Sequence, residues 1–171
     1  KDPLIILCTV FMGSISFVTS LVDREGRLTD KIARRWARML LWLGGVKVRI
    51  RGEENIDPSC NYIFVGNHLS LFDTPVVLGN VPARFLFLVS SKYVKLPFLG
   101  THLRRSGHFS VDQDDPRSAL KTMTQAARAA RRKNLSILLF PEGSRARDEM
   151  TEFKEGAAYI AIKAGVPVMP F

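Results

Sequence analysis

The sequence predicts an α/β domain with a mostly parallel central sheet flanked by helices, preceded by an N-terminal two-helix segment that associates with a membrane. Two patterns support this fold class. From residue 46 onward, short apolar runs alternate with helical patterns, which favours parallel strands covered on both faces. Residues 4–22, in contrast, are apolar enough to enter a bilayer. We expect two units, residues 1–45 and 46–171, and a chain that continues beyond Phe171.

The overall composition is that of a folded, basic protein. The chain has 171 residues, a net charge of +9 and 46% hydrophobic residues. This excludes a disulfide-stapled miniprotein and a disordered basic tail. Cys8 and Cys60 stand in unrelated contexts and predict no disulfide framework. The charge alone is compatible with nucleic acid, a membrane surface or small anionic ligands, so its distribution along the chain has to decide.

Residues 4–22 contain no charged side chain. A helix of this length is about 28 Å long, close to the bilayer core of about 30 Å. Polar and small residues dilute the segment, so a spanning helix and a helix that dips into the bilayer both remain open. A signal peptide and a buried core helix are the alternatives. The diluting residues are Thr9, Gly13, Ser14, Ser16, Thr19 and Ser20.

A second helix is predicted from Asp30, as its N-cap, to Leu43, after a polar connection over residues 23–29. Its cations recur at helical spacing and form one stripe, which suits anionic lipid headgroups. An ordinary surface helix is the alternative, but beside residues 4–22 we favour a membrane-anchoring hairpin. The stripe consists of Lys31, Arg34, Arg35 and Arg38.

The elements of the α/β domain follow in order. Strands are predicted over residues 46–51, 62–65, 85–89, 137–140 and 166–171. A long helix begins at Pro116 after Asp115, and a shorter helix covers residues 157–164 before Gly165. The long helix ends in a basic cluster that could face lipid, an acidic carrier protein, coenzyme A phosphates or water. This cluster is Arg128, Arg131, Arg132 and Lys133.

Two polar groups follow predicted strands. His68 comes directly after the strand at 62–65, at the end where open α/β sheets place their sites. Asp73 can orient the His68 imidazole and stabilise its protonated form, as a general base requires. A structural His–Asp pair is the alternative. We find no nucleophile elbow, Walker loop, dinucleotide fingerprint or metal-ligand set.

The second group, Phe140 to Arg145, follows the strand at 137–140. Gly143 permits close approach of a ligand to the backbone, and the planar guanidinium of Arg145 suits phosphate. A tight turn with a surface Glu–Arg pair is the alternative for this group.

Together these motifs resemble the glycerolipid acyltransferase family, most closely its 1-acylglycerol-3-phosphate O-acyltransferases. That family carries N-H-x-x-x-x-D and, about seventy residues later, F-P-E-G-[TS]-R. Both motifs are complete here, from Asn67 to Asp73 and from Phe140 to Arg145. Residues 107–113 resemble the intervening G-x-x-x-[IV]-D-R block, with Gln113 where that block usually has Arg. Residues 166–170 resemble the final V-P-[VI]-x-P block.

The resemblance implies acyl transfer from acyl-CoA or acyl carrier protein to the free hydroxyl of a lysophospholipid, with lysophosphatidate to phosphatidate as the expected case. It implies that His68 is the general base, that Asp73 orients it, and that no acyl-enzyme, metal or cofactor takes part. It also implies a set of acceptor-binding residues, namely Asn67, Lys92, Glu142, Gly143, Ser144 and Arg145.

Partners and location follow from the same resemblance. We expect membrane lipid as a partner, no nucleic acid, and a position at the cytoplasmic face of the inner membrane or an equivalent cytosolic leaflet. Other acceptors remain open, namely glycerol 3-phosphate, lysophosphatidylglycerol or an amino lipid, and a phospholipid could be the donor. A non-catalytic basic membrane-binding protein is the alternative from a different class.

Overall fold

The strands lie parallel in one five-stranded sheet. The computed structural model describes residues 2–23, 26–96, 99–133, 135–145 and 151–171, and its strands follow the order β3-β2-β4-β1-β5. The predicted mostly parallel sheet is therefore confirmed. The strands are β1 (Ile63–Val65), β2 (Phe85–Ser90), β3 (Phe109–Val111), β4 (Ser136–Leu139) and β5 (Val168–Pro170).

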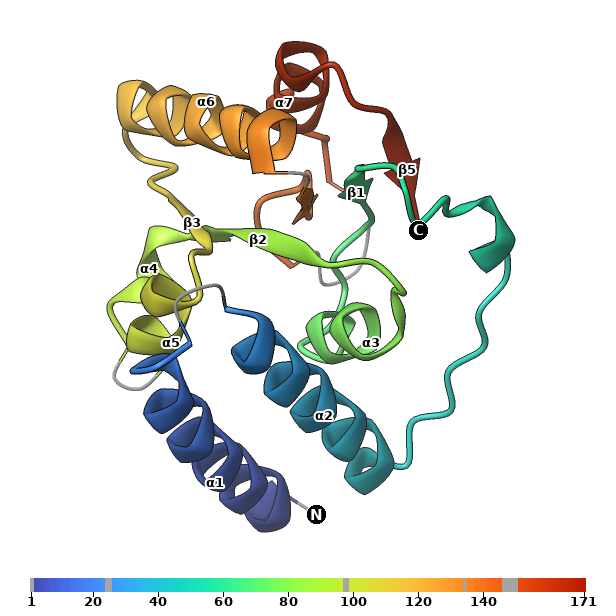
Figure 1. The fold of residues 1–171 in the computed structure, drawn as a ribbon, viewed down its shortest axis with the longest axis vertical. Helices are drawn as coiled ribbons and strands as arrows, with labels where there is room; N and C mark the ends of the chain where they lie inside the picture. The colour runs from blue at the N-terminus through green and yellow to red at the C-terminus, as the bar shows by residue number, and fades with distance from the viewer. Residues whose placement is uncertain (1, 24–25, 97–98, 134, 146–150) are drawn as a thin grey trace.

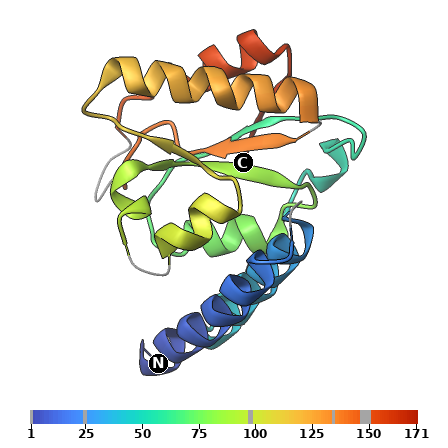
Figure 2. The same cartoon turned by 60° about the vertical axis from the view of Figure 1, so that its left-hand side comes forward.

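Helices cover both faces of this sheet (Figure 1). On one face lie α6 and α7, and on the other lie α2 to α5, with α1 packed outermost (Figure 2). The helices are α1 (Asp2–Ser20), α2 (Arg27–Gly44), α3 (Asp73–Asn80), α4 (Ser91–Val94), α5 (Leu99–Arg105), α6 (Pro116–Lys133) and α7 (Gly156–Ala164), with one 3-10 turn, η1 (Glu53–Asn55).

Alternate strand residues build two separate cores, because successive side chains of a strand point to opposite faces. Ile63 packs against Ile160 of α7 and the small residues of α6. Phe64, the next residue, packs on the other face with Phe85 and with Ala37 of α2. Fully buried alanines let α6 approach the sheet closely, and these are Ala126, Ala127 and Ala130.

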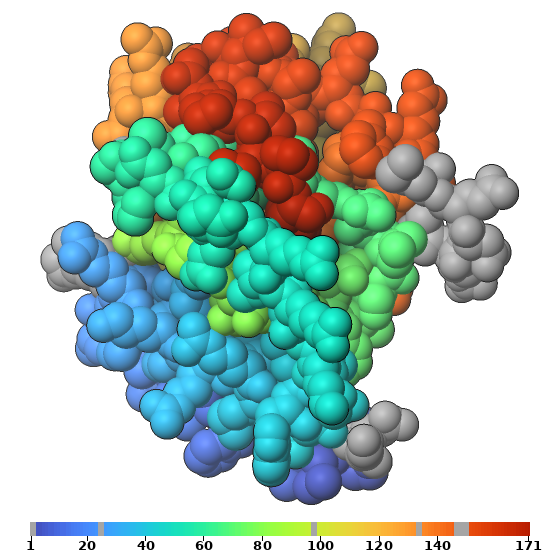
Figure 3. Space-filling model, turned by 90° about the vertical axis from the view of Figure 1, so that its right-hand side faces the viewer, coloured from blue at the N-terminus to red at the C-terminus, as the bar shows by residue number. Residues whose placement is uncertain are grey.

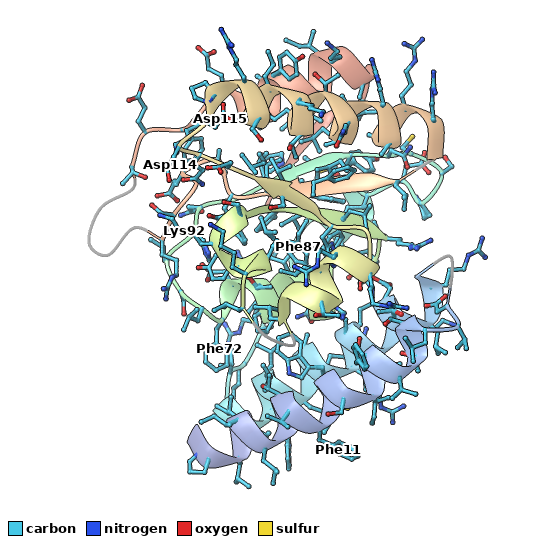
Figure 4. All side chains as sticks on the ribbon, turned by 90° about the vertical axis from the view of Figure 1, so that its left-hand side faces the viewer. Phe11, Phe72, Phe87, Lys92, Asp114 and Asp115 are labelled. Carbon is cyan, nitrogen blue, oxygen red and sulfur yellow. The ribbon has the colours of Figure 1, made fainter. Side chains whose placement is uncertain are left out.

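Helices α1 and α2 form the predicted hairpin. Cys8 and Met12 of α1 pack against Leu40 of α2, and the Trp36 indole donates a hydrogen bond to Thr9. The stretch Pro3–Ser20 is long and apolar enough to cross a membrane, and 17% of it is buried. This exposure contradicts the alternative of a buried core helix. Among the exposed side chains, Phe11 points away from the body of the molecule (Figure 4).

Helix α1 is also fastened to α5. Ser16 is 5% exposed, and its hydroxyl lies 2.8 Å from Nδ1 of His102. Arg105 Nε donates to the hydroxyl of Ser20 at 2.9 Å. The hairpin therefore has a defined position on the α3–α5 face of the sheet.

Helix α2 packs into the α/β domain through two arginines. Arg34 donates to the carbonyl oxygens of Leu78 and Val81, and Arg38 donates to that of Gly79. These groups lie at the C-terminal end of α3, where a helix leaves its carbonyls unpaired. Packing thus crosses residue 45, where we expected the boundary between two units.

The predicted lipid-facing stripe of α2 is consequently divided. Its member Arg34 binds α3 from a partly buried position, so the expectation that it faces headgroups is wrong, whereas Arg38 donates to α3 and stays exposed. Lys31 and Arg35 are exposed and remain available to lipid. The spacing of the four cations predicts that they share one face of the helix. It does not predict that α3 packs against part of that face.

Two further local predictions are wrong. Residues 46–51 form no strand, and Val46 and Ile50 are exposed in a segment that leads over the surface to η1, close to the C-terminal residues (Figure 3). The predicted cap Asp30 lies inside α2, which begins at Arg27. Asp23 instead accepts the backbone N–H of Thr29 at 2.7 Å.

The basic cluster of α6 lies on the side of the sheet opposite the hairpin (Figures 1 and 2). Neither α6 nor α7 contains an acidic residue. The cluster therefore does not share a face with the apolar surface of α1. Three of its arginines and a lysine of α7 line a hollow of about 500 Å³, and these cations are Arg128, Arg131, Arg132 and Lys163.

Candidate active site

The loop after β1 brings His68 and Asp73 together. Asp73 is the first residue of α3, and its Oδ2 lies 2.9 Å from Nδ1 of His68. The same oxygen accepts the backbone N–H groups of Leu69 and Ser70 at 2.7 and 2.8 Å. This network places the proton on Nδ1 and leaves the lone pair on Nε2. The arrangement is that of an imidazole base whose tautomer is set by a carboxylate.

Aromatic stacking restrains the His68 ring. The ring lies nearly parallel to that of Phe140, with centroids 4.1 Å apart and an interplanar angle of 12°. Phe140 in turn meets Phe171 edge-on at 6.0 Å. A side chain at Gly66 would displace the Phe171 ring, so the small residue permits this aromatic contact. The His68 ring is held by a hydrogen bond at its edge and by an aromatic ring on its face.

Glu142 connects the loop of His68 to the second motif. It is 4% exposed, and its Oε1 accepts the backbone N–H of His68 at 2.7 Å. Its Oε2 accepts the N–H and the hydroxyl of Thr151 at 3.1 and 3.0 Å. These hydrogen bonds, that from His68 foremost, hold the pKa of Glu142 below its ordinary value of 4.5. This link between the motifs was not predicted from the sequence.

The turn that carries Ser144 and Arg145 is held by residues that lie outside the second motif, namely Gln113 and Lys154. Gly143 has φ +74°, a left-handed conformation that glycine adopts without strain. Its carbonyl accepts a hydrogen bond from Nε2 of Gln113 at 2.8 Å, and Lys154 Nζ lies 3.5 Å from Oε1 of Gln113. The side chains of Ser144 and Arg145 are exposed beyond this turn.

The other predicted residues lie at the same edge of the sheet, because parallel strands end at one edge. Asn67 is exposed and lines a hollow of about 200 Å³ beside Asp73. Lys92 is exposed in α4, directly after β2, at the edge where Asp114 and Asp115 also lie (Figure 4). In the described part of the chain, no hydrogen bond joins Lys92 to His68 or Arg145.

Other reactive groups lie outside this arrangement. Cys60 is a free thiol that precedes β1, at the edge of the sheet opposite His68. The hydroxyl of Ser70 accepts the backbone N–H of Phe72, a local turn contact. Within the described ranges, no three side chains of His, Cys, Asp or Glu gather as metal ligands. What this edge of the sheet brings together is a histidine held by a carboxylate and the exposed side chains of Lys92 and Arg145.

A parallel α/β sheet with this histidine–aspartate pair and this turn at its carboxyl edge is the architecture of one class of protein, the acyltransferases. The model of the Acyltransferase family matches residues 47–171. The chain belongs to this family.

Within the family, the chain is similar to 1-acyl-sn-glycerol-3-phosphate acyltransferases. It is 30% identical to that of Haemophilus influenzae over 98% of this chain and 70% of the relative. It is 29% identical to that of Limnanthes douglasii over 77% of this chain and 47% of the relative, so it spans about half the length of the plant protein.

A solved structure agrees with the sequence relatives. The crystal structure of the 1-acyl-sn-glycerophosphate (LPA) acyltransferase PlsC from Thermotoga maritima matches with a TM-score of 0.74 and 27% identity. The match covers 98% of this chain and 71% of that one, so it includes the N-terminal hairpin as well as the sheet.

Proposed function

We propose that the chain transfers an acyl group from a thioester, acyl-CoA or acyl carrier protein, to the free hydroxyl of lysophosphatidate, giving phosphatidate. The observation that carries this proposal is the His68–Asp73 pair, with Nδ1 held at 2.9 Å and Nε2 left as the proton acceptor. The names of the relatives, which specify 1-acyl-sn-glycerol-3-phosphate as the acceptor, support the choice of lysophosphatidate.

The proposed reaction needs a base and correct positioning, because a thioester is already activated. Nε2 of His68 takes the proton of the acceptor hydroxyl while the oxygen attacks the thioester carbonyl carbon. Asp73 stabilises the resulting imidazolium. The carbon–sulfur bond then breaks, and the departing thiolate takes the proton from His68. The products are the ester and a free thiol, with no acyl-enzyme and no metal or prosthetic group.

The acceptor phosphate binds at the exposed turn after β4. Arg145 presents a planar guanidinium that forms paired hydrogen bonds with phosphate oxygens. Its neighbour Ser144 and, in the loop after β1, Asn67 supply uncharged polar groups, and Lys92 is a further cation at the same edge of the sheet. Glu142 and Gly143 contribute by shaping the turn, since both oxygens of Glu142 accept hydrogen bonds from protein donors.

The proposed site works at a membrane surface, at the cytoplasmic face. The exposed apolar side of α1 enters the lipid, where the acceptor resides, and the donor arrives from the aqueous side. Among the exposed apolar side chains of α1 are Leu7, Val10, Phe11 and Val18.

The test is product analysis by mass spectrometry with the full chain in mixed micelles. Lysophosphatidate, glycerol 3-phosphate, lysophosphatidylglycerol and an amino lysolipid are each combined with acyl-CoA and with acyl carrier protein. We expect phosphatidate from lysophosphatidate, and none with His68→Ala. Preference for another acceptor would overturn the substrate, and activity of His68→Ala within a few-fold of wild type would overturn the base. Membrane binding with no product from any pair would favour the non-catalytic alternative.

A further inference from the structure

Three residues from different parts of the chain meet at the turn that carries Arg145. Gln113 follows β3, Gly143 follows β4, and Lys154 precedes α7. Gln113 donates from Nε2 to the Gly143 carbonyl at 2.8 Å, and its Oε1 lies 3.5 Å from Nζ of Lys154. The backbone of Lys154 is fixed by its own hydrogen bond to the carbonyl of Pro141 at 2.9 Å. One amide side chain thus connects the turn to an ammonium group.

The ammonium group of Lys154 lies against the turn itself. A Cβ placed on Gly143 would be 3.0 Å from both Lys154 Nζ and Gln113 Nε2. Lys154 and Arg145 are both exposed, and among the described residues Lys154 makes no ion pair. Its charge is therefore not neutralised by the protein. Lys154 and Gln113 occupy the space that a side chain at position 143 would need, and Arg145 follows two residues further along the same exposed turn.

We propose that Lys154, oriented by Gln113, supplies a positive charge to the acceptor-phosphate site in addition to that of Arg145. This inference rests on the proposed function, since it names a further residue for the same acceptor. A phosphate monoester carries a charge of about −1.5 to −2 at neutral pH, so one guanidinium leaves it undercompensated and a second cation matches it. Gln113 is uncharged and acts as a positioning residue that holds the lysine beside the turn.

Three variants test the positive charge of Lys154 by removing it, by keeping it and by moving it to position 113. Lys154→Gln removes it, and we expect KM for lysophosphatidate to rise about 10- to 100-fold, the loss typical of a charge-assisted hydrogen bond, while kcat and KM for the donor change little. Lys154→Arg keeps it and should stay within a few-fold of wild type. The double variant Lys154→Gln/Gln113→Arg moves the positive charge from position 154 to position 113. It should reverse most of the rise in KM for lysophosphatidate. Lys121→Gln, an exposed lysine on α6, is the matched control.

Gln113→Ala tests the positioning residue. We expect a smaller rise in KM for lysophosphatidate, with kcat and the unfolding midpoint unchanged. A fall in kcat or in the unfolding midpoint without a change in KM would mean that Gln113 is merely structural.

Binding of glycerol 3-phosphate to the full chain, measured by calorimetry, separates this inference from the proposed function. Weaker binding by Lys154→Gln than by Lys121→Gln supports the cation site even if no acyl transfer is found. Equal binding by Lys154→Gln and wild type, or a double variant no better than Lys154→Gln, would overturn it.

Discussion

Glu142 Oε1 accepts the backbone N–H of His68 at 2.7 Å, although the two residues are 74 positions apart. One carboxylate therefore fixes the loop of the base relative to the turn that carries Arg145. In the proposed reaction, the hydroxyl at His68 and the phosphate at Arg145 belong to one acceptor molecule. The hydrogen bond of Glu142 thus sets the distance between His68 and the turn that carries Arg145, which the proposed acceptor has to span.

Replacing Glu142 by Gln should disturb this connection. An amide has one acceptor oxygen, so its NH₂ group would face either the N–H of His68 or that of Thr151. We expect kcat to fall about 10- to 100-fold, the range of one lost charge-assisted hydrogen bond, with KM for the donor unchanged. Initial rates over both substrates measure this. Glu152→Gln, an exposed neighbour, is the control, and a folded Glu142→Gln with wild-type kcat would contradict the role.

Asp73→Asn tests the orientation of the base. An asparagine carries no charge, so its oxygen accepts the three hydrogen bonds that Oδ2 of Asp73 receives more weakly, and it no longer stabilises the imidazolium. General-base catalysis contributes about 10²- to 10⁴-fold, so kcat should fall by at least 100-fold. The check is the rate at saturating acceptor and donor. A decrease of less than three-fold would assign the pair a structural role.

His108 should make stability depend on pH. Burial, with the neighbouring His102, lowers the pKa of His108 to about 3, and His108 accepts the N–H of Phe87 at Nδ1. The unfolded chain therefore binds a proton that the folded chain does not, and stability falls as pH drops below about 6.5, by at most about 1.4 kcal/mol per pH unit for this group.

The unfolding midpoint at pH 7.5 and pH 5 measures this dependence. His108→Gln keeps an acceptor but does not titrate, so its midpoint should fall less between the two values. His102 is also shifted downward by burial and accounts for part of the remaining slope. Identical slopes for wild type and His108→Gln would contradict the prediction.

Membrane binding should depend on α1 and not on the basic cluster of α6. Reversing three charges, Arg128→Glu/Arg131→Glu/Arg132→Glu, alters the face opposite the hairpin and should leave sedimentation with anionic liposomes unchanged. Phe11→Ser/Val18→Ser, on the exposed side of α1, should reduce it. Loss of sedimentation in the charge-reversed variant alone would place lipid on the α6 side.

Arg34→Met should destabilise the fold. It leaves the carbonyl groups of Leu78 and Val81 without their donor and the Asp30 carboxylate without its partner. Unpaired groups of this kind cost about 2–4 kcal/mol in total. Arg35→Met, at an exposed position, should cost less than about 0.5 kcal/mol. Denaturant unfolding in detergent compares the two, and equal stabilities would contradict the structural role of Arg34.

Much of the fold and the position of the site could be predicted from local patterns. The buried strands could be predicted because they are continuous apolar runs in the sequence. The polar motifs that directly follow two of these runs predicted a site at the carboxyl ends of the strands. Strand β3 was missed because its three residues are half-buried and carry no continuous apolar run. Residues 46–51 alternate as a strand would, but the alternation does not reveal whether a partner strand is present.

The connections within the site could not be read from the motifs. The motif predicts Glu142 as an acceptor-binding residue, but it does not show that a backbone N–H 74 residues away needs an acceptor. Gln113 stands where the family usually has Arg, so the pattern indicates the loss of a positive charge. The pattern does not show that the ammonium group of Lys154 lies next to the Gln113 side chain. Both relationships depend on how three strand ends come together, which is a property of the sheet order.

Helix α3 connects the α1–α2 hairpin to His68. This connection fixes the height of His68 relative to the hairpin. The helix has eight residues and is about 12 Å long. Asp73 at its first residue holds His68, and its far end is held by Arg34 and Arg38 of the hairpin. Once α1 lies in a bilayer, Nε2 of His68 stands at a set level above the lipid plane. In the proposed reaction, a lipid whose hydroxyl lies deeper or higher than that level would be a poor acceptor, whatever its headgroup.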